Sequence, residues 1–293
     1  MAEPARIRPL REARTPARED PEERRCSLLR WVEGPDGRPE LLDIPLTPED
    51  FLDPQIGDTL VQGRRHETVA RHLTDLLERG LASRPDVLVV HDLKHLLGPG
   101  LPGPGPDVSV IVGLRDPDPD MQSYDVRATG IPPSLIIEVI SPFDRQIREV
   151  DERVKPKLYA RIGVEEYLLV DLPRKANNRR FQLRGLRLDD QRVYQPLEPD
   201  AQGRLLSQVT GLAFGVSAKG DQVEVFVAAT GERLLSSKEE EKERKAAQQA
   251  LQATERARKA AEEKAVREAE GRKAAEAELA RLREELQRLR GDG

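Results

Sequence analysis

The sequence has few of the residues that build disulfide-rich, zinc-binding or membrane-spanning proteins. Its single cysteine, Cys26, excludes a disulfide framework and a zinc site made of several cysteines. No apolar run approaches the roughly 18 to 20 residues that cross a bilayer. The N-terminus is charged and lacks the apolar segment of a secretory signal. We therefore expect an intracellular, cytoplasmic protein with no membrane partner.

Aromatic residues and proline are absent from the C-terminal part of the chain. All ten aromatic residues and all 23 prolines of the 293-residue sequence precede residue 236, whereas residues 236–290 contain fifteen Lys or Arg and thirteen Glu. At about 150 residues per domain, this length allows one or two domains. We predict a disordered arm over residues 1–25, a folded domain over residues 26–235 and a charged helical tail over residues 236–293.

The charge of the chain is weakly acidic. The net charge is −5; the tail contributes +2 and Asp292 contributes −1, so residues 1–235 carry −6. Proteins that bind nucleic acid without regard to sequence are usually basic. Any role with nucleic acid must therefore depend on a particular site and not on bulk charge.

The folded part has a mixed order of helices and strands, which predicts an α/β fold. A helix is expected over residues 60–81, with Gly80 as its stop, and a charged amphipathic segment over residues 144–161. Thr47 is expected to cap a short helix that begins at Pro48. Strands are predicted over residues 27–33, 40–44, 86–92, 107–113, 134–140, 166–171, 181–188, 193–196, 205–209 and 222–227.

Two acidic residues stand out against this pattern. Glu138 interrupts the apolar strand SLIIEVI, and a carboxylate buried there must be paired, protonated or bound to metal. Asp107 follows Pro106 and opens another strand. Two acids on neighbouring strands can hold one Mg²⁺, and a nearby lysine completes a hydrolytic site. Two other interpretations stay open: Asp107 as a strand-start acid, and Glu138 as half of a structural ion pair with an arginine.

Four sequence blocks then carry a resemblance to a known family. Pro106-Asp107, the segment EVISP from Glu138, Lys155 to Tyr159, and GVEEY from Gly163 resemble, in order and spacing, the Uma-two family of putative restriction endonucleases. That family belongs to the PD-(D/E)XK nuclease superfamily. The resemblance covers about residues 40–215 of this chain.

This resemblance implies a restriction-endonuclease-like core, a mixed sheet of about five strands between helices, and a metal-dependent endonuclease that hydrolyses DNA. Asp107, Glu138 and the Val139 carbonyl would bind Mg²⁺ or Mn²⁺, and Lys155 would be the electrostatic partner. A catalytically inactive module, with the fold kept as an interaction platform for a coiled-coil tail, is the alternative.

Two residues depart from the superfamily pattern. Ile140 stands where the third motif residue should be lysine, and Pro156 directly follows Lys155. Proline disfavours a helix at the residue before it, so we expect the helix to break at Lys155 and restart with Pro156 in its first turn. Such a break could turn Lys155 away from the site and leave Lys157 as a substitute.

Three further residues receive structural interpretations. His66 lies where the family tends to have a histidine, but we interpret it as a helix-start or packing residue. Asp171 is interpreted as a strand-end residue and Cys26 as inert.

The tail has the composition of a long helix or coiled coil. Leu279, Leu282, Leu286 and Leu289 follow the 3-4-3 spacing of a heptad seam about two heptads long. We expect a projecting helix that self-associates weakly as a parallel homodimer. A monomeric charged helix that aids solubility is the alternative.

Overall fold

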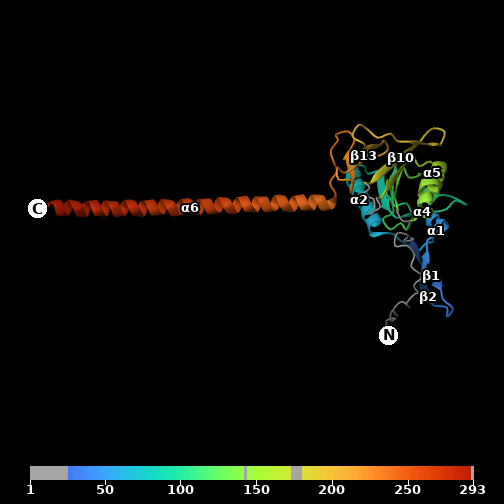
Figure 1. The fold of residues 1–293 in the computed structure, drawn as a ribbon, viewed down its shortest axis with the longest axis horizontal. Helices are drawn as coiled ribbons and strands as arrows, with labels where there is room; N and C mark the ends of the chain where they lie inside the picture. Colours follow the sequence, from blue (N-terminus) through green and yellow to red (C-terminus); the bar gives the residue numbers. More distant parts are fainter. Residues whose placement is uncertain (1–25, 142–143, 173–179, 292–293) are drawn as a thin grey trace. The chain divides into compact units, whose positions relative to one another are not determined.

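The computed structural model describes residues 26–141, 144–172 and 180–291, with side chains of the C-terminal helix described as far as residue 283. The predicted arm over residues 1–25 lies outside the described residues. The chain divides into two compact units, residues 1–236 and residues 237–293 (Figure 1). No helix in the described part of the chain is long and apolar enough to cross a membrane.

A mixed six-stranded sheet forms the centre of the first unit. Its strand order is β11-β10-β9-β8-β6-β4, with β8 and β9 parallel and the other neighbours antiparallel. All six strands fall on segments that the sequence predicted, which confirms the expected α/β class. Their bounds are β4 (Val87–His91), β6 (Val108–Val112), β8 (Leu135–Ile140), β9 (Glu166–Asp171), β10 (Gln182–Leu188) and β11 (Tyr194–Pro196).

Helices cover both faces of this sheet (Figure 1). On one face, α2 (Arg64–Leu81) packs Leu73 and Leu77 against Val108, Val110 and other strand residues. On the other face lie α4 (Arg145–Glu149), the π-helical turn η1 (Val150–Val154) and α5 (Lys155–Ile162). Strand β8 is buried on both faces, which explains its almost continuous apolar sequence.

The predicted end of α2 at Leu81 is confirmed, but its predicted start at Leu60 and the role of Gly80 were wrong. Residues Thr59–Val61 form strand β3, which pairs with β1 (Ser27–Glu33), so the helix begins only after the extended Gly63. At the other end the helix continues through Gly80. A Cβ at Gly80 would lie 2.6 Å from Leu234 Cδ1, so this glycine permits a close approach and does not stop the helix.

Smaller elements surround the central sheet. The predicted hairpin is present as β1 and β2 (Pro39–Pro45), and Thr47 caps α1 (Pro48–Leu52), its side chain accepting a hydrogen bond from the Asp50 amide. Four further short elements, of three to five residues, were not predicted. They are β5 (Lys94–Leu96), β7 (Ser123–Asp125), α3 (Val126–Thr129) and β13 (Leu212–Val216).

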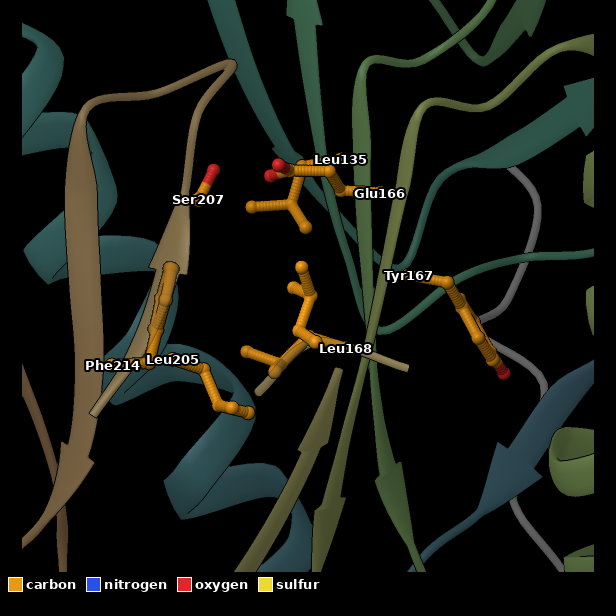
Figure 2. A pocket seen from close by; sticks show the side chains of 8 residues that line it. Leu135, Glu166, Tyr167, Leu168, Leu205, Ser207 and Phe214 are labelled. Carbon is orange, nitrogen blue, oxygen red and sulfur yellow. The ribbon is translucent and has the colours of Figure 1, made fainter. Parts of the chain in front are cut away.

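A second antiparallel sheet packs beside the first. It consists of β12 (Leu205–Ser207), β13 and β14 (Val223–Val227). Figure 2 shows the small apolar space between the sheets, with Leu168, Leu205 and Phe214 along it and Glu166 and Ser207 at one end. The Glu166 carboxylate accepts hydrogen bonds from Arg187 on β10 and from the Gln208 amide, and thereby ties the two sheets together.

The second unit is a single helix, α6 (Ser237–Gly291). Its 55 residues are almost entirely strong helix formers, and the predicted helix over this region is confirmed. Among its described side chains, Leu251, Val266, Leu279 and Leu282 are exposed large apolar groups.

Candidate active site

The two predicted acids meet where strands β6 and β8 stop pairing. The antiparallel ladder ends with Val108 opposite Ile137, and one step further in the same register brings Asp107 opposite Glu138. Side chains alternate along each strand, so Asp107 and Glu138 both project from the sheet face that α5 covers. Both side chains are buried, with residue exposures of 6% and 1%.

Carboxylate oxygens replace the strand pairing at this point. The Val139 amide donates to Asp107 Oδ2 at 2.7 Å, and the Asp107 amide donates to Glu138 Oε2 at 3.4 Å. Each carboxyl group therefore accepts a hydrogen bond from a backbone amide of the opposite chain segment. The Val139 contact involves its amide; the role of its carbonyl as a metal ligand stays a prediction.

Lys155 reaches the site from α5. Its Nζ lies 2.9 Å from Glu138 Oε1 and 2.8 Å from an oxygen of Asp151, a residue that the sequence analysis missed. Tyr159, one turn further along α5, donates its hydroxyl to Glu138 Oε1 at 3.1 Å. The partner of Glu138 is thus a lysine, not the arginine of the structural alternative.

The π-helical turn explains how Lys155 keeps this direction beside Pro156. In η1 the hydrogen bond from the Lys155 amide reaches back five residues to the Val150 carbonyl, and α5 then begins with Pro156 in its first turn. The expected break at Lys155 is therefore absent: the chain stays helical from Arg145 to Ile162, and the side chain points into the site. Lys157, the proposed substitute, is exposed.

His66 is a buried residue at the start of α2, as expected, and it also contacts the cluster. It lies in the first turn of α2 and is 7% exposed, and its Nε2 is 3.1 Å from Asp107 Oδ2. Its Nδ1 is buried without a hydrogen-bond partner among the described residues. A histidine in the first turn of an amphipathic helix resembles an ordinary packing residue, so only the tertiary contact reveals this role.

Charge and burial shift the ionisation of the cluster. Burial raises the pKa of Glu138 to about 8, with the nearby Lys155 opposing the shift and Asp151 and Asp107 adding to it. Burial likewise raises the pKa of Asp151 to about 6, against the effect of Lys155. For Lys155, burial lowers the pKa, but the carboxylates of Asp151 and Glu138 outweigh it and the net shift is upward.

The pKa values of Asp107 and His66 shift in opposite directions. Burial raises the pKa of Asp107, but the neighbouring His66 and Lys155 charges outweigh it and the net pKa is lowered. Burial lowers the pKa of His66, but Asp107 reverses the effect and the net pKa is raised. The charged neighbours thus favour the ionised form of Asp107, whereas burial favours the protonated form of Glu138.

The donor set fits a hard divalent cation that keeps most of its water. In the part of the chain that the structure describes, no three His, Cys, Asp or Glu side chains are arranged as a complete metal cage. Mg²⁺ needs only one or two carboxylates, because it retains several waters. Asp107 and Glu138 supply two buried carboxyl groups from neighbouring strands.

The remaining predicted residues lie outside the cluster. Asp171, at the end of β9, accepts hydrogen bonds from Arg148, in agreement with its interpretation as a strand-end residue. Ile140 is fully buried with Tyr159 and Tyr167. The position where the motif has lysine therefore contributes to the hydrophobic core in this chain. Cys26 is half-buried, and burial raises the pKa of its thiol; its inertness stays a prediction.

Comparison with known proteins identifies one family. The family model Uma2, described as "Putative restriction endonuclease", matches residues 38–257, which is most of the chain. A similar solved structure is that of a putative nuclease belonging to DUF820 from Anabaena variabilis, with 16% sequence identity and a TM-score of 0.37. The match covers 63% of this chain and 82% of that one. A search of the curated proteins gives no match.

Proposed function

Since this chain belongs to the Uma2 family of putative restriction endonucleases, we propose that it is a metal-dependent endonuclease that hydrolyses phosphodiester bonds in DNA. One observation carries the proposal: Asp107 from β6, Glu138 from β8 and Lys155 from α5 converge in a single buried cluster. The three residues are distant in sequence, and the fold brings them together at the end of a strand ladder.

Each side chain has a distinct role in this proposal. Asp107 and Glu138 would hold Mg²⁺ or Mn²⁺ through carboxylate oxygens, with the Val139 carbonyl as a third ligand. The bound cation would polarise the phosphate and lower the pKa of a coordinated water. Lys155 remains protonated because two carboxylates surround it, so it acts by electrostatic stabilisation of the phosphate charge that develops during hydrolysis and not as a base.

His66 and Asp107 are the most exposed members of the cluster. We infer that the DNA phosphate approaches from their side, at the loop of residues 98–106 that precedes β6. His66 orients Asp107 by occupying Oδ2 together with the Val139 amide.

Plasmid cleavage tests this function. The full chain should nick or linearise plasmid DNA with Mn²⁺ or Mg²⁺ and lose this activity with EDTA or after Glu138→Ala. Asp171→Asn is the matched control, because Asp171 is an ion-paired acid at a neighbouring strand end outside the cluster. If the wild type does not cleave, or if Glu138→Ala cleaves as well as the wild type, the proposal is wrong and the inactive interaction module is favoured.

We further propose that α6 joins two chains as a parallel homodimer, which would bring two nuclease units to one DNA duplex. The support is the seam that begins with Leu279 and Leu282, both exposed in the single chain. Two active sites, one for each strand, would suit double-strand cleavage.

A further inference from the structure

Lys155 has one more acidic neighbour than the proposed reaction requires. Besides Glu138, its ammonium contacts Asp151, whose side chain is only 4% exposed. An acid in an exposed helical surface costs little, but a buried carboxylate must be offset by specific partners. The position of Asp151 beside the lysine therefore calls for a role.

The π-helical turn holds Asp151 in place. The Asp151 carbonyl accepts a hydrogen bond from the Tyr167 hydroxyl at 2.8 Å, which fixes the turn to β9. Asp151 and Lys155 are four residues apart along the helical segment, so their side chains lie on the same side. The turn thereby places both the Lys155 ammonium and the Asp151 carboxylate near the end of β8.

A third group, the Phe51 ring, also contacts the ammonium. Lys155 Nζ lies 4.0 Å from the centre of the Phe51 ring, in the geometry of a cation–π contact. Phe51 is buried and belongs to α1. Lys155 is thus held by Glu138, by Asp151 and by an aromatic face.

We propose that Asp151 is a positioning residue: it keeps the Lys155 ammonium in place when the Glu138 carboxylate binds a metal cation. Glu138 cannot serve both partners at full strength, because its Oε1 contacts Lys155 and Tyr159 while a bound cation would draw on the same carboxylate. A lysine side chain is long and flexible, and without a second anchor its head group would move. Asp151 lies outside the Asp107–Glu138 pair and remains available as that anchor.

Asp151→Asn in the full chain tests this role, which rests on the proposed function. The variant should fold, because Lys155 keeps Glu138 as a partner and the cluster loses an excess negative charge. We expect kcat for plasmid cleavage to fall about 10- to 100-fold, as is typical when a supporting partner is removed, with KM for DNA unchanged. Asp151→Glu should recover part of the loss. Asp151→Ser replaces Asp151→Asn if that variant does not fold.

Glu152→Gln is the matched control. Glu152 is the next residue on the same turn and is ion-paired with Arg148 and Arg184, away from Lys155. Its substitution removes an ion pair from the turn without touching the ammonium, so kcat should stay within twofold of the wild type. An equal loss in both variants would overturn the proposal in favour of a general effect on the turn.

A second measurement separates this inference from the proposed function. The side-chain ¹⁵N–¹H signal of the Lys155 ammonium, assigned by its loss in Lys155→Met, can be followed with and without Mg²⁺. In the wild type it should persist when Mg²⁺ is added; in Asp151→Asn it should broaden or vanish. If the signal is unchanged in Asp151→Asn with Mg²⁺, Asp151 does not position the lysine. Failure of the wild type to cleave DNA would instead refute the nuclease function alone.

Discussion

Replacement of Lys155 by methionine removes the ammonium of the cluster while keeping an unbranched side chain of similar length. The side chain of Lys155 is 1% exposed, and its Nζ contacts Glu138 and Asp151. The change leaves two buried carboxyl groups without their shared cation. Removing one partner of a buried ion pair costs about 3–5 kcal/mol of folding free energy.

This cost should depend on pH in a defined direction. The pKa of Glu138 is raised to about 8 and that of Asp151 to about 6, so both groups favour the protonated form in the folded state. An acid with a raised folded pKa contributes stability at low pH that is lost as pH rises through that pKa. Without Lys155 both pKa values would rise further, so the variant should lose more stability between pH 5 and pH 9 than the wild type.

At pH 5 the predicted difference in stability is therefore small. Both carboxyl groups then carry their protons, and the variant differs from the wild type mainly in having no cation–π interaction with Phe51, which is worth about 1 kcal/mol. At pH 8.5 the difference should reach about 3–5 kcal/mol, because the buried charges then lack a partner.

Urea unfolding followed by intrinsic fluorescence measures this difference. All ten aromatic residues precede residue 236, so the signal reports on the first unit and not on α6. Lys157→Met is the control: this exposed lysine lies two residues away, and its replacement should change stability by less than about 0.5 kcal/mol. If Lys155→Met lost the same free energy of unfolding at both pH values, the electrostatic explanation would be refuted. Altered packing would then account for the loss.

Three other predictions address the metal, the backbone and the tail. Mn²⁺ affinity, measured by calorimetry, should rise from pH 6 through about pH 8 and level off only above the Glu138 pKa, because Glu138 must lose its proton to bind metal; a flat profile would exclude it as a ligand. Gly163→Ala should lower stability by about 1–2 kcal/mol in thermal unfolding, because Gly163 ends α5 with φ +92°; no change would mean that this strain is relieved elsewhere. Sedimentation of the full chain at tens of micromolar should show a heavier species than a chain that ends at Ser236; two monomers would refute dimerisation through α6.

The sequence predicted the central part of the fold well because its strands carry strong local signals. Strand β9 and strand β1 have the predicted bounds, since both are short segments with several large apolar or aromatic residues. The start of α2 was wrong because Leu60 fits the helical apolar pattern equally well. Pairing of β3 with β1, a contact across about thirty residues, decided its conformation.

The same distinction holds for the candidate site. Glu138 could be found from the sequence because a lone carboxylate in an apolar strand is costly unless it has a partner. Asp107 could be found only together with the other three sequence blocks of the family resemblance, since an acid after proline at a strand start is common by itself. Asp151 could not, since it lies in a charged segment where acids are normally solvated. Only the packing of that segment against β8 and β9 buries it beside Lys155.

The sequence by itself determined the α/β class, the separate helical tail and the two acids, because each depends on local composition or on periodicity along a few residues. The tertiary structure alone decided that His66 meets Asp107, that Lys155 and not Lys157 enters the site, and that Asp151 accompanies it. These contacts join residues from different elements. Burial between the sheet and the helices strengthens the interactions between their charges, and no local sequence pattern predicts that burial.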